Sequence, residues 1–233
     1  MVGEKWIVND YDIGYFLDWA SFTQKNPKKV RNKYHGYGNV DYSNHDEDYV
    51  ELSETLSEVV ESSKFFTNSK SYLGQKVTEK NIILGSKRNS VIHFATHNTS
   101  ITKYGLNNIP ALVVSKTDNN NGDGYLDAFE IQKIDLSNSD IILSACSTLY
   151  SKNSTDNFSK LIRAFKISGS RSIMATRWDV ESQSAVLIST NYAENLSKGL
   201  YPYESISNIQ RKFLANSEYN HPAFWAAYVT IIN

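Results

Sequence analysis

The chain of 233 residues has a single cysteine, Cys146. One thiol cannot form an intramolecular disulfide, so the fold cannot depend on an oxidising compartment. An excess of charge of one sign is also lacking, because 24 Lys and Arg residues stand against 25 Asp and Glu residues. This balance predicts neither a nucleic-acid-binding groove nor an acidic tail.

Long apolar runs are absent as well. No stretch approaches the roughly 18 apolar residues that cross a bilayer, and the start, MVGEKWIVNDYD, lacks the apolar centre of a signal peptide. The glycine-rich phosphate-binding patterns GxGxxG and GxxxxGK[ST] do not occur. We therefore expect a cytoplasmic protein that binds neither membrane nor nucleic acid, and the missing phosphate loops count against an unrelated ligand-binding α/β domain.

Apolar segments alternate with amphipathic ones from residue 71 onward. The expected strands are 71–74, 90–95, 110–115, 140–145, 172–176 and 223–232, and the expected helices are 78–85, 126–134, 157–169, 181–199 and 203–217. Nearly continuous apolar strands separated by helices indicate an α/β fold with a mostly parallel sheet covered on both faces. The length suits one core, so we expect a single domain over residues 1–233.

The first part of the chain gives weaker signals. WIVNDYDIGYFL is typical of one or two strands, and KYHGYGNV (33–40) of another, so residues 1–45 are expected to hold short strands and a linker. Residues 44–62 open with an acidic cluster and place Leu52, Leu56 and Val59 at helical spacing. This pattern predicts a helix whose acidic face is solvated.

Reactive side chains follow two of the expected strands. His97 comes after VIHFAT, and Cys146 comes after DIILSA. Ligands of an open parallel sheet bind beyond the carboxyl ends of its strands. An imidazole there, with an ordinary pKa of ~6.5, can take the proton of a thiol and leave the nucleophilic thiolate.

The order and spacing of this pair are similar to those of caspases, in which the histidine lies ≈ 50 residues before the nucleophilic cysteine. Here the separation is 49 residues (146 − 97). The backbone N–H groups of Asn98 and Cys146 are the expected oxyanion donors. An inert, buried cysteine is the alternative interpretation of Cys146.

A second histidine, His93, lies on the strand that precedes His97. On one strand the two rings would be roughly 13 Å apart, whereas zinc ligands must lie ~2 Å from the metal. We therefore expect no metal site here and interpret His93 as a packed, hydrogen-bonded structural residue.

One loop resembles a calcium site. NNNGDGYLDAFE (119–130) matches much of the EF-hand pattern, with candidate ligands Asn119, Asn121, Asp123, Asp127 and Glu130. The preceding segment predicts a strand, so the entering helix of an EF-hand is missing. A polar loop followed by a short helix is the alternative, and no other cofactor is expected.

Four strings, in this order, resemble the CHAT domain, a caspase-like peptidase domain often found after tetratricopeptide repeats. They are HFATH (93–97), GYLDAFEIQKIDLSNSDIILSACST (124–148), LIRAFKISGSRSIMATRWDVES (161–182) and HPAFWAAYV (221–229). With weaker matches upstream, the resemblance covers roughly residues 10–233.

The resemblance implies a caspase-like three-layer α/β/α sandwich and a His–Cys dyad, which falls on His97 and Cys146. It further implies a cysteine endopeptidase of bacterial signalling or defence that cleaves a protein or peptide and is gated by a sensor such as tetratricopeptide repeats. Two features depart from the family: Asn98 stands where glycine is usual, and LYSKNSTDN replaces a glycine-rich stretch after the cysteine. A catalytically degenerate binding or scaffold module therefore remains an open alternative.

The resemblance also points to residues that contact the substrate. In caspase-like folds the residue two before the cysteine and the loop after the next strand border the pocket for the side chain before the scissile bond, the P1 pocket. These are Ser144 and the segment ATRWDVES, in which Trp178 would form an apolar wall and Asp179 or Glu181 would bind a basic side chain. Asp179 equally fits the N-cap of the helix that begins near Glu181.

Overall fold

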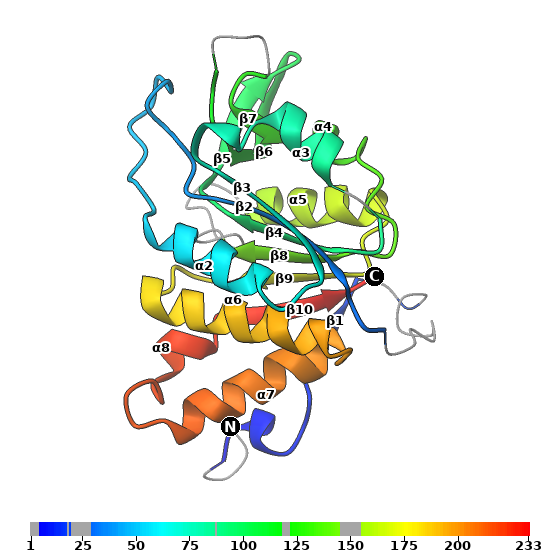
Figure 1. The fold of residues 1–233 in the computed structure, drawn as a ribbon, viewed down its shortest axis with the longest axis vertical. Helices are drawn as coiled ribbons and strands as arrows, with labels where there is room; N and C mark the ends of the chain where they lie inside the picture. Colours follow the sequence, from blue (N-terminus) through cyan, green and yellow to red (C-terminus); the bar gives the residue numbers. More distant parts are fainter. Residues whose placement is uncertain (1–4, 18, 20–28, 87, 118–121, 145–154) are drawn as a thin grey trace.

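The computed structural model describes residues 5–17, 19, 29–86, 88–117, 122–144 and 155–233, with the backbone alone for 155–159. Within this part of the chain the strands form two sheets (Figure 1). The large sheet has the order β1-β10-β9-β8-β4-β2-β3, and the small one has the order β5-β6-β7. The strands are β1 (Tyr15–Phe16), β2 (Lys33–Gly38), β3 (Asn68–Leu73), β4 (Val91–Ala95), β5 (Asn98–Lys103), β6 (Leu106–Val113), β7 (Tyr125–Asp127), β8 (Asp140–Ser144), β9 (Ser172–Thr176) and β10 (Tyr228–Ile232).

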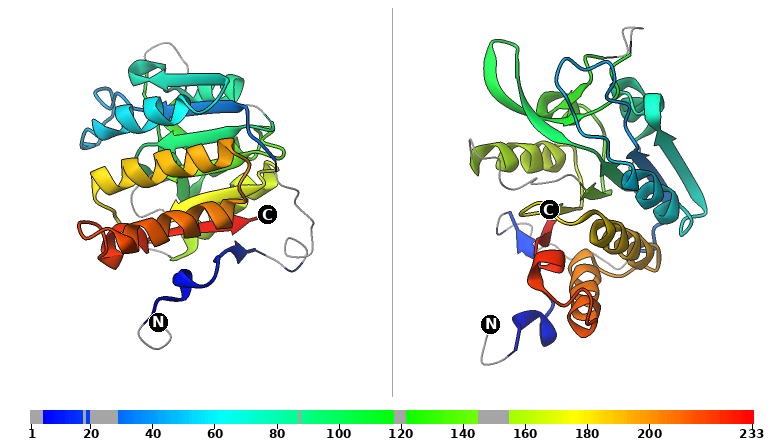
Figure 2. Two further views of the ribbon diagram at one scale, coloured as in Figure 1. Left: turned by 60° about the horizontal axis from the view of Figure 1, so that its bottom comes forward. Right: turned by 90° about the vertical axis from the view of Figure 1, so that its left-hand side faces the viewer.

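Helices cover both faces of the large sheet, which confirms the three-layer α/β/α sandwich (Figures 1 and 2). One layer holds α2 (Glu54–Ser63), α6 (Ser182–Ser197), α7 (Pro202–Ala215) and α8 (Pro222–Trp225). The other holds α3 (Glu79–Gly85), α4 (Ala128–Ile131), α5 (Thr155–Ile167) and the small sheet. Single 3₁₀ turns lie at Ile7–Asn9 and Gly74–Lys76. None of the helices described here is long and apolar enough to cross a membrane.

The central strand β4 shows how the sequence produces two cores. All five of its residues are buried. Ile92 and Phe94 belong to the cluster on the α5 side, while Val91 and Ala95 belong to the cluster on the α6 side. Side chains alternate across a strand, so an apolar run of this kind must be covered on both faces.

Within the large sheet, the neighbouring strands β3, β2, β4, β8 and β9 pair in parallel, as expected, but β10 runs antiparallel to β9. The single strand predicted over 223–232 is instead the helix α8 followed by β10. Pro222 at the first helical position and the His221 ring, which accepts the N–H of Ala223, start this helix.

A hairpin that the apolar pattern does not predict follows β4. Strands β5 and β6 pair antiparallel, and their tip, Tyr104–Gly105, has φ values of 56° and 72°. Two successive positive φ values are typical of the tight type I′ turn that suits the twist of a hairpin.

Helix α2 packs unusually close to β2. A Cβ atom added to Gly36 would lie 2.5 Å from Val59 Cγ1, and one added to Gly38 would lie 2.8 Å from Val59 Cγ2. The glycines of KYHGYG therefore let α2 rest on the strand. As a result, the segment just before α2 lies beyond the carboxyl ends of the strands.

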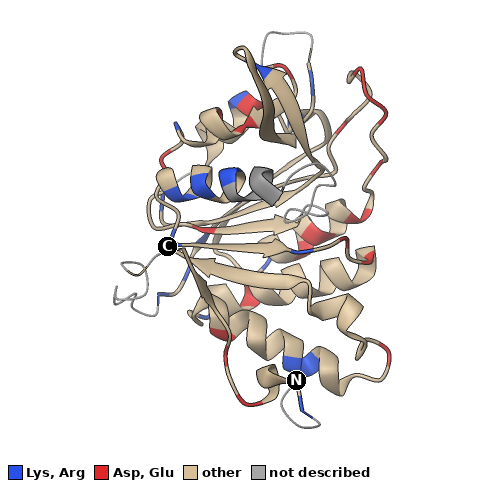
Figure 3. Cartoon of the chain, turned by 180° about the vertical axis from the view of Figure 1, so that it is seen from behind, with Lys and Arg blue, Asp and Glu red and all other residues tan. Residues whose placement is uncertain are grey.

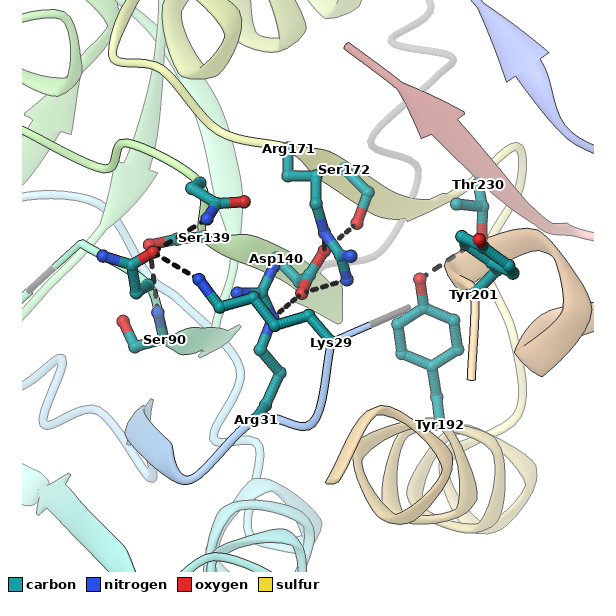
Figure 4. Close-up of polar contacts among 12 residues, drawn as sticks. Lys29, Arg31, Ser90, Ser139, Asp140, Arg171, Ser172, Tyr192, Tyr201 and Thr230 are labelled. Atoms are coloured by element: carbon teal, nitrogen blue, oxygen red, sulfur yellow. Dashed lines mark hydrogen bonds and ion pairs between the residues drawn. The ribbon is translucent and has the colours of Figure 1, made fainter. Parts of the chain in front are cut away.

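The amino end of β8 carries a buried charge cluster (Figure 4). Asp140 accepts hydrogen bonds from Arg31 Nε at 2.7 Å, from Arg171 Nε at 2.8 Å and Nη2 at 2.7 Å, and from Ser172 Oγ at 2.6 Å. The cluster ties the chain before β2 to the starts of β8 and β9, and it lies at the end of the sheet away from His97.

Candidate active site

Strands β4 and β8, which precede the two proposed catalytic positions in the sequence, end side by side at one edge of the sheet. The strands pair in parallel as far as Ala95 and Ser144. His97 and Cys146 each come two residues after these partners in the sequence (97 − 95 and 146 − 144). Cys146 lies outside the described residues, so the structure describes strand β8, which precedes it in the sequence, and the proposed base His97.

The ring of His97 is held by a backbone carbonyl. His97 Nε2 lies 2.7 Å from the oxygen of Val50. A carbonyl can only accept a hydrogen bond, so Nε2 carries the hydrogen in the neutral ring and Nδ1 keeps its lone pair. The arrangement therefore leaves Nδ1 as the nitrogen that can take up a proton.

Two tyrosines flank this ring. The centroids of Tyr42 and Tyr49 lie 5.2 Å and 5.6 Å from that of His97. The Tyr49 hydroxyl donates to Glu47 at 2.6 Å, and burial, reinforced by Glu47, raises the pKa of Tyr49. Tyr49 thus remains neutral, and the two rings restrict the imidazole to one orientation.

The main chain of His97 is also fixed, because Val113 N–H donates to its carbonyl at 2.9 Å. Next to it, the Thr96 hydroxyl donates to the Val113 carbonyl. His97 is therefore anchored to the small sheet as well as to β4. Since β4 ends at Ala95, His97 is not on the strand that carries His93.

Residues 39–51, which hold the ring, were missed as site residues by the sequence pattern. The predicted helix over 44–62 begins only at Glu54, and the residues before it form the support for His97. The acidic cluster indicated the start of a helix. The position of a backbone carbonyl such as that of Val50 cannot be recognised from residue types.

A cavity of about 470 Å³ opens beside the ring and shares Tyr42 and Tyr49 with it. It is bounded by residues 39–43, by Gly74 and by the segment that holds the histidine. Four carboxylates belong to its lining: Asp41, Glu47, Asp48 and Glu51. The space is thus negatively charged and adjoins the proposed base.

The other expected substrate-contacting residues lie at the same edge of the sheet. Ser144 ends β8 and is half-buried, and Asn98 begins β5 opposite Leu112. Trp178 follows β9; the residue is 39% exposed, and its Nε1–H donates to the Ala223 carbonyl at 3.3 Å. Trp178 therefore presents a face to solvent while its polar edge is fixed on α8.

The proposed N-cap role of Asp179 is wrong. The cap of α6 is Glu181, whose carboxylate accepts the N–H groups of Gln183 at 2.9 Å and Ser184 at 2.8 Å. Capping occupies the carboxylate of Glu181 and thereby disfavours it as an acceptor for a basic substrate side chain. Asp179 is exposed and stays the acidic candidate in this loop.

His93 is a structural residue, as expected. It is fully buried, with Nδ1 2.8 Å from the Tyr34 hydroxyl and Nε2 2.9 Å from Glu58 Oε1. Burial, with a further contribution from Glu58, raises the pKa of Tyr34 well above its usual value. Among the described residues, no group of three or more His, Cys, Asp or Glu side chains could hold a metal ion.

The carboxylates of the loop that resembles a calcium site are paired with a lysine from β5. Lys103 Nζ lies 2.9 Å from Asp123 Oδ2, 3.0 Å from Asp127 Oδ2 and 3.3 Å from Glu130 Oε1. Asp127 also caps α4 by accepting the N–H groups of Phe129 and Glu130. The ammonium group stands where the ion would bind, so these carboxylates do not fit a calcium site. Asn119 and Asn121 lie outside the described residues.

Comparison with known proteins agrees with this architecture. The sequence profile of the CHAT domain matches residues 2–233. The crystal structure of the Arg-specific cysteine proteinase gingipain R (RgpB) is similar, with a TM-score of 0.52 at 13% identity over 89% of this chain and 49% of that one. A complex of Porphyromonas gingivalis RgpB pro- and mature domains gives 0.53 at 14% over 87% and 47%.

The two gingipain chains show the fold alone at this level of identity, and the present chain spans about half of their length. Among curated proteins, none matches the sequence. The family match covers nearly the whole chain, and the sandwich is the one that the family's caspase-like fold requires. The chain therefore belongs to the CHAT domain family.

Proposed function

We propose that this chain is a cysteine endopeptidase in which Cys146 is the nucleophile and His97 the general base. The observation that carries the proposal is the paired end of β4 and β8, two residues before each of these positions, together with the fixed imidazole. Family membership and the caspase-like fold support the same chemistry.

In the proposed reaction, Nδ1 of His97 takes the thiol proton and the sulfur of Cys146 attacks the scissile carbonyl carbon. The N–H groups of Asn98 and Cys146 donate to the oxyanion. Nδ1 then gives its proton to the leaving amine as the C–N bond breaks, and water hydrolyses the thioester by the reverse steps. Throughout, the Val50 carbonyl accepts the Nε2–H and holds the ring in place.

The substrate is a protein or peptide, with Ser144, Trp178 and Asp179 as the proposed walls of the P1 pocket. The cavity shares Tyr42 and Tyr49 with the surroundings of His97, and we propose that it holds part of the substrate. A peptide library without any preference for Lys or Arg at P1 would exclude the acidic role of Asp179. We further propose that a sensor partner gates the activity in bacterial signalling or defence.

The experiment that tests the dyad needs no natural substrate. The alkylation rate of Cys146 by iodoacetamide, followed by mass spectrometry across pH, reports the pKa of the thiol. We expect fast alkylation well below the ordinary thiol pKa of ~8.5, and we expect this low-pH reactivity to disappear in His97→Ala.

Identical pH profiles for the wild type and His97→Ala would contradict the dyad. They would favour the alternative that Asn98 motivates, a catalytically degenerate module that binds proteins. Circular dichroism of both forms serves as the control for folding.

A further inference from the structure

An apolar groove lies between the hairpin and α5, on the layer opposite α6 and α7. It has a volume of about 360 Å³, and its walls come from β6, from α4 and from one side of α5. Its largest apolar residues are well exposed: Leu106 by 50%, Phe129 by 39% and Ile167 by 64%. Contiguous exposed apolar surface on a folded domain is typical of an interaction site.

The rim of this groove is basic. Lys160 and Arg163 line it, and Lys166 follows on the same helix; Figure 3 shows these positively charged positions along α5. No acidic residue belongs to the lining described here. The carboxylates of Asp127 and Glu130, which are close in sequence to Phe129, are already bound to Lys103.

Of these basic residues, Arg163 is the clearest candidate for a charged contact with a partner. It is exposed, and it has no carboxylate partner within the described part of the chain. An arginine beside exposed Ile167 and Phe129 combines a charged anchor with apolar contacts, which is the composition found at the energetic centre of many interfaces.

The wall formed by β6 disfavours a partner that would add a strand. β7 pairs with β6 only from Ala111 to Val113, so the segment before it faces the groove. The N–H of Val114 donates toward β7, to the Gly124 carbonyl, whereas the N–H of Val113 donates to the other side. By this alternation Pro110 sits where a donor toward the groove would be needed, and proline has none.

From these features we propose that the groove binds an acidic amphipathic helix of a partner protein. Leucine- or phenylalanine-type side chains at helical spacing would enter the apolar floor, and glutamate or aspartate at the flanks would pair with Arg163. The occupant is thus defined by its chemistry: an apolar stripe bordered by negative charge.

The position of the groove links such a partner to the candidate site. α5 begins at Thr155, directly after the segment that contains Cys146, and β6 pairs with β5, which begins directly after His97. His97 is not among the described residues that line the groove. Binding itself is independent of the peptidase proposal; only an effect of the partner on Cys146 rests on it.

The test selects binders from a displayed library of 16-residue helical peptides with random exposed positions, using the 233-residue chain as bait. The dissociation constant of the most enriched peptide is then measured by fluorescence anisotropy. We expect peptides with apolar residues at i, i+3, i+4 and i+7 and with flanking acids, and at least tenfold weaker binding to Arg163→Glu and to Ile167→Asp.

Two controls make the outcome decisive. Lys212→Glu makes the same type of charge change on an exposed position of α7, in the opposite layer, and should leave the affinity unchanged. A peptide in which the acids are replaced by lysine should bind Arg163→Glu better than the wild type. The proposal is overturned by a library without binders, by selected peptides that are not acidic, or by binding that Arg163→Glu does not weaken. It is equally overturned if phosphatidylserine vesicles bind through Arg163 and the peptides do not.

Discussion

The two ends of β8 differ in the role of the polar groups around them. At the amino end, Asp140 is fully buried and both of its oxygens accept charged hydrogen bonds. At the carboxyl end, Ser144 is half-buried, and the neighbouring strand leads to a histidine with one nitrogen bound and one left for chemistry. The comparison separates polar groups that hold the fold from polar groups that can react: both oxygens of Asp140 accept hydrogen bonds inside the protein, whereas His97 has one ring nitrogen left for chemistry.

Burial alone does not determine whether a carboxylate is ionised in the folded chain. Burial raises the pKa of Asp140, but Arg171 and Arg31 lower it further, so the net shift is downward and the group stays ionised. Glu79 is also buried, yet its neighbours are Glu130 and Asp123; burial and these carboxylates raise its pKa to about 8. The difference lies in the charge of the neighbours.

The largest effect is expected on catalysis, from a change of His97 beyond the carboxyl end of β4. His97→Ala should lower kcat/KM by roughly 10³-fold or more, because the variant has no group to accept the thiol proton. Urea denaturation should show nearly unchanged stability, since the ring is at the edge of the fold. The measurement is turnover of a fluorogenic peptide chosen from a library, and activity that survives the change would mean that His97 is not the base.

At the opposite end, Asp140→Asn should destabilise the fold by about 3–5 kcal/mol, because two buried guanidinium groups lose their counter-charge. The measurement is the free energy of unfolding in urea. Asp135→Asn is the matched control: its partner Arg88 is exposed, and the change should be too small to measure. Equal effects at the two positions would show that Arg31 and Arg171 do not need Asp140.

The pH dependence of stability tests the difference between Glu79 and Asp140. Its raised pKa means that the folded chain holds a proton that the unfolded chain has released between pH 4.5 and about 8, so stability from this group falls as pH rises through that window. Glu79→Gln keeps an acceptor for the Gly124 N–H and should be more stable than the wild type by about 1–2 kcal/mol at pH 9, with little difference at pH 4. Thermal unfolding across pH measures this.

Glu54→Gln is the control for that experiment, since Glu54 opens α2 as Glu79 opens α3 but is exposed. Its effect should not vary with pH in the same way. A Glu79→Gln variant that parallels the wild type from pH 4 to pH 9 would show that Glu79 ionises normally.

The smallest expected effect concerns calcium. Because the Lys103 ammonium group already lies among the carboxylates of Asp123, Asp127 and Glu130, millimolar calcium should shift the melting temperature by less than about 1 °C relative to chelator. Calorimetric titration of chelator-treated protein provides the second measurement. Saturable heat of binding would show that the ion displaces the lysine.

The layers of the fold could be predicted because apolar periodicity reports burial directly. Runs such as VIHFA and DIILS carry apolar residues at both alternating sets of positions, so both faces must be covered. The hairpin β5–β6 was missed because its first half, NTSITK, is polar and half-exposed and its tip depends on backbone torsion angles.

The candidate site was less predictable, for reasons that differ between residues. The strands that precede His97 and Cys146 could be predicted from their apolar runs, whereas the contact of His97 with the Val50 carbonyl could not, because a backbone carbonyl is independent of residue type. The misassigned cap shows that a local rule locates a helix start only to within a few residues, since Glu181 and not Asp179 caps α6. The ion pair of Lys103 with Asp127 joins residues 24 positions apart, and no local pattern reveals it.

The hairpin that begins one residue after His97 has a use in engineering. Its tip projects away from the sandwich (Figure 2), and Tyr104 there is 59% exposed. A ligand-binding domain inserted between Tyr104 and Gly105 would transmit its conformational change along β5 to His97. The same turn thus provides an entry point for building a chemically switchable version of this chain.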